Sequence, residues 1–572
     1  MTDSTCDVCG EPVSSGDLCD EHKIEPVLYH LDDTCGREYI EEGRVYSGVV
    51  NGVVDYGVFV SLNSSISGLV HESNMSEPLD VGDEVDVRIS EIREDGDLNL
   101  SPVETDGYTE AYVGSDAESE DSEVEVETLE DRVGETVSVT GKVLQTKQTS
   151  GPTIFTLGDG TGTVECAAFV EAGVRAYPEV DTDDVVTTRG VVEERDGELQ
   201  IEVSEMEKLE GEEEKEVRDS FEDDIDSRAD PPEVEPLVES EHVSELWDDI
   251  RKVAKAVRRA VMTGRPIIVR HHADADGISS GAVVERAVFS LMDEVQDDPD
   301  APYHLFRRMP SKAPFYEMED VTRDLNYALQ DTERHGHPTP ILLMIDNGST
   351  EEDTPAYEIA RSYDVPIYIV DHHSPDDAVE EHVEEHVNPY LVGGDYSITS
   401  GMLCTELARL IEPGVEDDVR HVPAIAGKGD RSEADEMEEY VEIAEDEGYG
   451  ENHAERVAKA LDYEAFHLKY DDGRHLVNHI LDIADNDVHA DLVDKLADRA
   501  DEAFERQMSA ALPHVEEEEL ENGTSLYTLN VEKYTHKFTF PTPGRPRARY
   551  TTGRWRTTRE PSSPWDTDPT SA

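Results

Sequence analysis

The sequence predicts a multidomain protein in which two small all-β barrels precede an α/β domain with a mainly parallel sheet. Short apolar stretches separated by glycine turns recur through residues 42–102 and 132–209, as they do in small barrels. After residue 241, helical periodicity alternates with short apolar stretches rich in β-branched residues, which is typical of strands buried on both faces of a parallel sheet. At 572 residues, the chain is long enough for several domains.

The chain is very acidic, with 48 Lys and Arg against 135 Asp and Glu and a formal net charge of −87. In ordinary salt, such self-repulsion would destabilise a fold and repel nucleic acid. Because the acidity extends over every domain, we interpret it as adaptation to the salt-filled cytoplasm of a halophile, where the Debye length falls to about 3 Å. The alternative, a disordered acidic protein, conflicts with the periodic apolar segments.

Two features of the sequence bear on location and on metal content. No stretch of about 18 apolar residues occurs, and the N-terminus lacks a basic region followed by an apolar one, so we expect a cytoplasmic protein. Residues 1–37 are expected to bind one structural zinc ion, because two close pairs can close a tetrahedral site in a segment too short for a core. The expected ligands are Cys6, Cys9, Cys19 and His22, with His30 and Cys35 as possible substitutes.

Residues 42–102, with their short strands and glycine turns, closely resemble the S1 motif, an RNA-binding barrel of the OB type. The resemblance places Tyr56, Phe59 and His71 on the binding face, where stacking on bases is worth about 1–3 kcal/mol per ring. The alternative is that Tyr56 and Phe59 fill the barrel. Residues 103–131 are almost purely acidic or small and are interpreted as a linker.

Residues 132–209 contain five strand-like stretches, with a glycine-rich turn after the second, and look like an OB-fold nucleic-acid-binding domain. Candidate contacts are Lys142, Lys147, Phe155 and Phe169, and a structural adaptor role is the alternative. Residues 210–240 are interpreted as a second acidic linker. A predicted helix at about 241–263 then carries a basic patch that either faces phosphate or pairs with local acids: Arg251, Lys252, Lys255, Arg258 and Arg259.

Polar residues follow three predicted strands at their carboxyl ends, the edge at which ligands bind in open α/β sheets. Carboxylates and imidazoles suit manganese or magnesium, and there are enough of them for two ions, which can activate water and stabilise a phosphoryl transition state. Any one such residue could be a helix cap or turn residue, but the set indicates an assembled site. Its members are His272, Asp274, Asp276, Asp346, Asp371, His372 and His373, with Asp430 as a further candidate.

The H-x-D-x-D-G stretch at 272–277, the D-H-H triplet at 371–373 and the separate Asp346 and Asp430 together resemble the DHH phosphoesterase family and its archaeal RecJ-like exonuclease branch. The resemblance covers about residues 245–510 of a domain predicted at 241–520. It implies one metal on His272, Asp274 and Asp346, and a second on Asp276, Asp346, His372 and Asp430. It further implies catalytic roles for Asp371, which would orient a ligand histidine, and for His373, which would contact the scissile phosphate.

Members of this family normally carry a smaller C-terminal substrate-binding domain with a G-G-H stretch. Residues 521–572 look like a remnant of that domain followed by an abnormal basic tail, since residues 545–572 hold six Arg, three acids and no Ile, Leu, Val or Met. We interpret the tail as the product of a reading frame shifted near residue 545, which would leave the DHH-associated domain missing and put activity in question. The alternative is a genuine basic tail that binds nucleic acid.

The sequence therefore predicts a hydrolase that acts as a RecJ-like exonuclease on single-stranded DNA or RNA, with two manganese or magnesium ions. Its partners would be single-stranded nucleic acid and replication or repair proteins. One alternative is a phosphodiesterase for oligonucleotides or cyclic dinucleotides. The other is a non-catalytic replication scaffold that binds nucleic acid.

Overall fold

The structure is a computed structural model of the chain, which divides into two compact units, Met1–Ser122 and Glu123–Ala572. It describes residues 27–541 except 32–34, 37–39, 41–42, 55–56, 64, 76–78, 80, 94–97, 104, 106–107, 114–122, 171–172, 196–197, 297–299, 312, 470, 484–487, 521–524 and 535–538. The predicted zinc ligands Cys6, Cys9, Cys19 and His22, and the basic tail, lie outside the described residues. Of the two substitute ligands, His30 lies in a strand and Cys35 is buried.

The first unit contains a closed five-stranded barrel in the order β2-β3-β4-β6-β5. Its strands are β2 (Val45–Val54), β3 (Gly57–Ser61), β4 (Ser67–His71), β5 (Glu84–Ile92) and β6 (Leu98–Pro102). Two further strands extend the sheet beside β2 by parallel pairing, β1 (Val27–Leu31) and β7 (Thr109–Val113). Part of the predicted linker at 103–131 is therefore a strand. Tyr46, Val60 and Val70 fill the barrel interior.

The second unit begins with another closed barrel, in the order β10-β12-β11-β8-β9, which confirms the five predicted strands. They are β8 (Thr136–Gln148), β9 (Thr153–Gly158), β10 (Thr163–Ala168), β11 (Val185–Arg195) and β12 (Glu198–Lys208). Phe155 is fully buried in this barrel, so it is core rather than a candidate contact, whereas Phe169 is 63% exposed.

A helix, α1 (Glu212–Arg228), occupies much of the segment predicted as a second acidic linker. Its three N-terminal glutamates favour the positive end of the helix macrodipole. Phe221 and Ile225, four residues apart, form a narrow apolar stripe that packs with Leu144 of the barrel and Met262 of the next helix. Such a stripe is too narrow to stand out against the surrounding acids in the sequence.

The α/β domain is built on a five-stranded sheet in the order β14-β13-β15-β16-β17, with every neighbouring pair parallel. The strands are β13 (Ile267–His271), β14 (Phe306–Pro310), β15 (Ile341–Ile345), β16 (Ile367–Val370) and β17 (Glu385–Val387). The predicted parallel sheet is confirmed. The strand order reverses direction between β13 and β15, and such a switch point opens a crevice at the carboxyl edge of the sheet.

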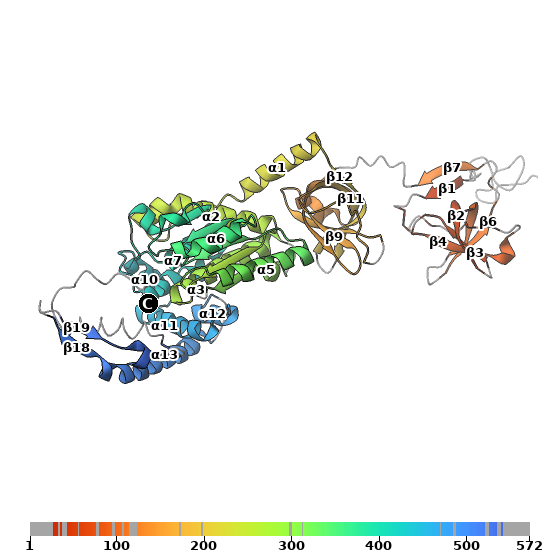
Figure 1. Ribbon diagram of the computed structural model, residues 1–572. Coiled ribbons are helices and arrows are strands. Elements are labelled where there is room, and N and C mark those ends of the chain that lie inside the picture. Colours follow the sequence, from red (N-terminus) through yellow and green to blue (C-terminus); the bar gives the residue numbers. More distant parts are fainter. Residues whose placement is uncertain are drawn as a thin grey trace, which may run out of the picture. The chain divides into compact units, whose positions relative to one another are not determined.

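Helices cover both faces of this sheet (Figure 1). Alternate strand residues such as Ile267 and Leu343 pack in the core with α2 (Glu241–Met262), α3 (Ala275–Val295) and α7 (Ser400–Ile411). Their neighbours, such as Ile268 and Leu342, pack on the other face with α5 (Met318–His335) and α6 (Thr354–Arg361). This double burial explains why the strands are apolar throughout.

The remaining described elements are mostly helices that follow the sheet. They are α4 (Ala301–Leu305), α8 (Glu416–Val419), α9 (Val422–Asp430), α10 (Met437–Asp446), α11 (Glu451–Leu468), α12 (Arg474–Leu481), α13 (His489–Ala511), the hairpin of β18 (Glu516–Glu519) and β19 (Ser525–Thr528), and α14 (Val531–Tyr534). None of the helices within the described ranges combines the length and apolar character needed to cross a membrane.

Candidate metal centre

The predicted polar residues meet at the carboxyl edge of the sheet. His272 follows β13, Asp346 follows β15 and His372 follows β16, while Asp276 lies in the first turn of α3 and Asp430 ends α9. Their ligand atoms form three groups, each within 4.8 Å: His272, Asp274 and Asp346; Asp276, His372 and Asp430; Asp346, His372 and His373. The fold thus brings together every residue that the resemblance assigned to metal binding.

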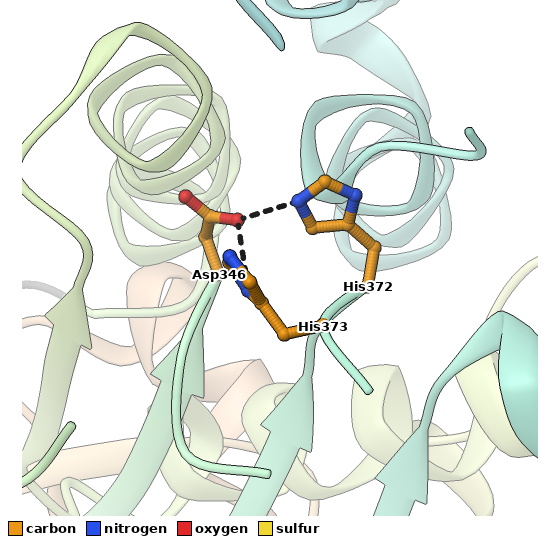
Figure 2. Close-up of side chains that lie close together, drawn as sticks. All are labelled: Asp346, His372 and His373. Atoms are coloured by element: carbon orange, nitrogen blue, oxygen red, sulfur yellow. Dashed lines mark ion pairs between the residues drawn. The ribbon is translucent and has the colours of Figure 1, made fainter. Parts of the chain in front are cut away.

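Asp346 lies between the two proposed ion positions. Its Oδ2 is 3.6 Å from Nδ1 of His272, and its Oδ1 is 3.2 Å from Nε2 of His372. Figure 2 shows the imidazoles of His372 and His373 both directed at this carboxylate from the end of β16. Nδ1 of His272 is also 2.8 Å from Oδ2 of Asp274. Each oxygen of Asp346 therefore faces a different ligand group, as a bridging carboxylate must.

His372 presents an unprotonated nitrogen to the second group. Its Nδ1 lies 2.7 Å from the carbonyl oxygen of Tyr396, and because a carbonyl only accepts, Nδ1 carries the proton. In the neutral ring the lone pair is then on Nε2, which lies 3.3 Å from Oδ2 of Asp430 and 3.6 Å from Oδ2 of Asp276. This arrangement suits a metal ligand.

Several ligand atoms in the centre are buried and make no hydrogen bond of good geometry, namely Nδ1 of His272, Oδ2 of Asp346 and Nε2 of His372. Burying such groups costs free energy unless something else satisfies them. Oxygen and imidazole donors of this kind fit manganese or magnesium. The side chains present therefore fit two divalent ions.

The carboxylates also repel one another strongly. Burial and the charges of Asp346 and Asp430 raise the pKa of Asp276 well above its usual range. Burial would raise the pKa of Asp346 too, but the nearby imidazoles of His272 and His372 outweigh burial and hold the pKa well below its usual range. Divalent cations would relieve this repulsion directly.

Local backbone geometry explains the residue types at the edge. Asp346 has φ 58°, in the left-handed region that Asp tolerates better than most residues. Gly277 is required by close approach, because a Cβ there would lie 2.4 Å from the carbonyl oxygen of His272 and 2.9 Å from Oδ2 of Asp346. The D-G pair therefore lets α3 begin directly against both ligands.

The start of α7 holds two of the carboxylates and was not identified from the sequence. The backbone N–H groups of Ser400 and Gly401 donate to Asp276 over 3.0 and 2.8 Å, and the Ser400 hydroxyl donates to Asp346 over 3.1 Å. The available signal was Thr399-Ser400-Gly401, a hydroxyl-rich helix start. Nothing in the sequence links that signal to residues more than 50 positions away.

Asp371 contacts His373 rather than the ring of His372. Its Oδ1 accepts a hydrogen bond from Nδ1 of His373 over 2.8 Å and from the backbone N–H of His372 over 2.8 Å. Burial alone would lower the pKa of His373, but the Asp371 carboxylate outweighs it and raises the pKa to about 8. The His373 side chain is 40% exposed, so of the residues in this centre it is the one most open to a substrate.

A buried hydrogen-bond chain holds the backbone of His373. Nδ2 of Asn388 donates to the His373 carbonyl over 2.9 Å and to Oγ of Ser349 over 3.3 Å. Nδ1 of His386 donates to Glu380 over 2.7 Å, so Nε2 accepts from the Ser349 hydroxyl over 2.9 Å. These residues position the D-H-H loop and were also missed by sequence reasoning.

Arg270 and His271, which had no assigned role, are structural. Arg270 is fully buried and pairs with Asp324 and Asp320, with Nε 2.8 Å from Oδ2 of Asp324. His271 donates from Nδ1 to the carbonyl of the ligand His272 over 2.7 Å. Burial, helped by the charge of Arg308, lowers the pKa of His271 to about 3, so the ring is neutral.

On the first barrel, Phe59 and His71 share one face. Gly57 is opposite His71 in the β3–β4 pairing and lies two residues from Phe59, so both side chains point the same way. Phe59 is only partly buried, between the fully buried Val58 and Val60, and therefore faces outward. Tyr56 lies outside the described residues.

Two family models match the barrels. The S1 RNA binding domain matches residues 39–101, and an OB-fold nucleic acid binding domain matches residues 137–209. Both domains indicate nucleic-acid binding.

The chain also resembles proteins over much greater lengths. Uncharacterized protein MJ1198 of Methanocaldococcus jannaschii is 41% identical over 546 residues, which cover 91% of this chain and 72% of that protein. A solved DHH domain from a protein described as a member of a family of ribosomal proteins is 42% identical, covers 61% of this chain and 81% of its own, and superposes with a TM-score of 0.59. Exonuclease RecJ bound to manganese is 16% identical, over 47% of this chain and 70% of its own, with a TM-score of 0.36. The chain belongs to the family of MJ1198 and is a RecJ-like DHH protein with S1 and OB-fold domains.

Proposed function

We propose that the protein is a metal-dependent phosphoesterase that acts as an exonuclease on single-stranded DNA or RNA by two-metal hydrolysis. The observation that carries this proposal is the bridging position of Asp346, whose two oxygens face different groups of carboxylate and imidazole ligands. A pair of divalent ions in such a centre activates water and stabilises both the attacking and the leaving oxygen.

The chain's own residues would supply the rest of the chemistry. Asp346 would hold both ions, with His272 and Asp274 on one side and His372, Asp276 and Asp430 on the other. The exposed His373, kept protonated by Asp371, would donate a hydrogen bond to an oxygen of the scissile phosphate. The Asn388 chain keeps His373 in place while the substrate changes charge.

The two barrels support a polymeric substrate over a dinucleotide, because a dinucleotide needs no extended binding surface. Phe59 and His71 on the first barrel would stack on bases. The proposal also includes one structural zinc ion on Cys6, Cys9, Cys19 and His22.

End-blocked oligonucleotides test the proposal. With manganese present, the protein should release mononucleotides from a labelled single strand, and blocking one end should stop the release. Paired DNA and RNA strands of one sequence would identify the substrate, and the end that must stay free gives the polarity. A protein that cleaves only cyclic dinucleotides would contradict the exonuclease assignment. A protein that binds strands without cleaving them would be a scaffold.

A further inference from the structure

A second site of unusual charge lies at the opposite edge of the sheet from the metal centre. A cavity of about 400 Å³ opens between the second barrel, α1, α2 and the amino-terminal ends of the strands. Arg265, Thr339 and Tyr368 lie at or just before the starts of β13, β15 and β16. Boundaries between domains are favoured places for ligand sites, and the volume suits a nucleotide-sized group.

The cavity lining carries one positive charge more than it carries negative charges. Its cations are Lys142, Arg259 and Arg265, and its acids are Asp183 and Glu222. Nζ of Lys142 lies 2.8 Å from Asp183 and 3.3 Å from Glu222. Arg259 pairs with Glu222 and lies 3.6 Å from Asp226. The two acids thus offset Lys142 and Arg259, which leaves Arg265.

Arg265 has no carboxylate within ion-pair distance among the residues that the structure describes. Its guanidinium donates only to Thr339, from Nε to the carbonyl over 2.7 Å and from one terminal nitrogen to the hydroxyl over 3.4 Å. Burial lowers the pKa of Arg265, and the neighbouring charge of Arg259 lowers it further. A half-buried cation is therefore kept beside another cation, which costs free energy unless an anion shares the cavity.

The rest of this segment shows how unusual Arg265 is. In a chain with 135 acids and 48 basic residues, acids are always close by. The basic patch of α2 is engaged as the sequence suggested, since Lys252 pairs with Asp249 and Glu385, and Lys255 pairs with Asp226 and Asp230. Arg265, only three residues beyond α2, has no such partner.

We propose that this cavity binds a phosphate group through Arg265. The phosphate would belong either to the backbone of a single strand held at the second barrel or to a free nucleotide. A planar guanidinium with free donors suits phosphate oxygens, and one uncompensated positive charge matches one phosphodiester. For the strand, the inference rests on the proposed function and adds a remote anchoring subsite to it.

Geometry separates this subsite from the metal centre. β13 has five residues, so its two ends lie about 17 Å apart at roughly 3.3 Å per residue. A dinucleotide in the metal centre cannot also reach Arg265, whereas a longer strand can occupy both places. Arg265 should therefore matter for long substrates only.

The test compares Arg265→Gln with Arg286→Gln, which removes the same charge from an exposed arginine already paired with Asp418. Both changes are made in full-length chains that also carry Asp346→Asn, so that strands are bound without being cut. Affinity for a long single strand is measured across a series of KCl concentrations, and affinity for AMP is measured separately. Each phosphate contact contributes about 0.7 to the slope of log affinity against log salt.

Arg265→Gln should make that slope shallower by about 0.7, and Arg265→Lys should restore it, while Arg286→Gln leaves it unchanged. Loss of AMP binding with an unchanged strand slope would identify a free nucleotide as the source of the phosphate. If Arg265→Gln changes neither the slope nor AMP binding, the inference is overturned. In otherwise unmodified chains, Arg265→Gln should leave dinucleotide hydrolysis intact, so failure of the hydrolase proposal itself would appear separately, as no hydrolysis by the unaltered protein.

Discussion

Replacing Asp346 by Asn removes the charge that the two ligand groups share and little else. Asn has almost the same shape and also tolerates the left-handed conformation that residue 346 adopts at φ 58°. The amide oxygen can still accept the hydrogen bond from the Ser400 hydroxyl. The fold should therefore survive, and any loss of metal binding can be attributed to charge.

The size of the effect follows from the distances. A carboxylate whose oxygens lie 3.2 and 3.6 Å from His372 and His272 contacts both ion positions. A pair of unit charges about 4 Å apart is worth about 4 kcal/mol at an effective dielectric constant of about 20. Each divalent ion should therefore bind at least about 10³-fold more weakly in Asp346→Asn, since about 1.36 kcal/mol is tenfold.

Isothermal titration with manganese measures the affinity, and mononucleotide release from a labelled strand measures the rate. Both should fall by at least about 10³-fold in Asp346→Asn, while strand binding by the barrels persists. Glu352→Gln is the matched control, because it removes one exposed carboxylate from the same domain. Hydrolysis by Asp346→Asn at the unaltered rate, with manganese affinity preserved, would refute the bridging role.

Three further predictions concern other parts of the molecule. Asn388→Ala removes the donor to the His373 carbonyl and should cost about 1–3 kcal/mol in denaturant unfolding and lower kcat, with manganese affinity kept; loss of manganese binding would contradict this positioning role. Phe59→Ala should weaken single-strand binding by about 1–3 kcal/mol without affecting dinucleotide hydrolysis, and unchanged affinity would place Phe59 outside the binding surface. Because the chain has a net charge of −87, its Tm should rise steeply with KCl, and a Tm independent of KCl would refute the halophilic interpretation.

The metal centre could be predicted from the sequence because its ligands lie at strand ends. An apolar strand such as Ile341–Ile345 followed at once by Asp346 indicates both the parallel sheet and the edge at which its ligands gather. The same reasoning located His272 and His372. The D-H-H triplet and the H-x-D-x-D-G stretch then limited the chemistry to one family.

Other features depend on tertiary contacts that no local pattern records. Ser400 reaches Asp276 and Asp346 only because α7 packs beside α3. The partner of Asp371 was predicted to be a ligand histidine, yet His372 is oriented by the carbonyl of Tyr396 instead. In α1, acidic composition hid a helix that two apolar residues anchor. Arg265 looked like any other arginine until its surroundings were known.

The most direct test of the two-metal centre is the electron paramagnetic resonance spectrum of the manganese-loaded protein. If Asp346 bridges two ions about 3.5–4 Å apart, the bound manganese should give the spectrum of a magnetically interacting pair. Asp346→Asn should abolish that spectrum. A spectrum of isolated manganese alone, at saturating metal, would contradict the shared centre.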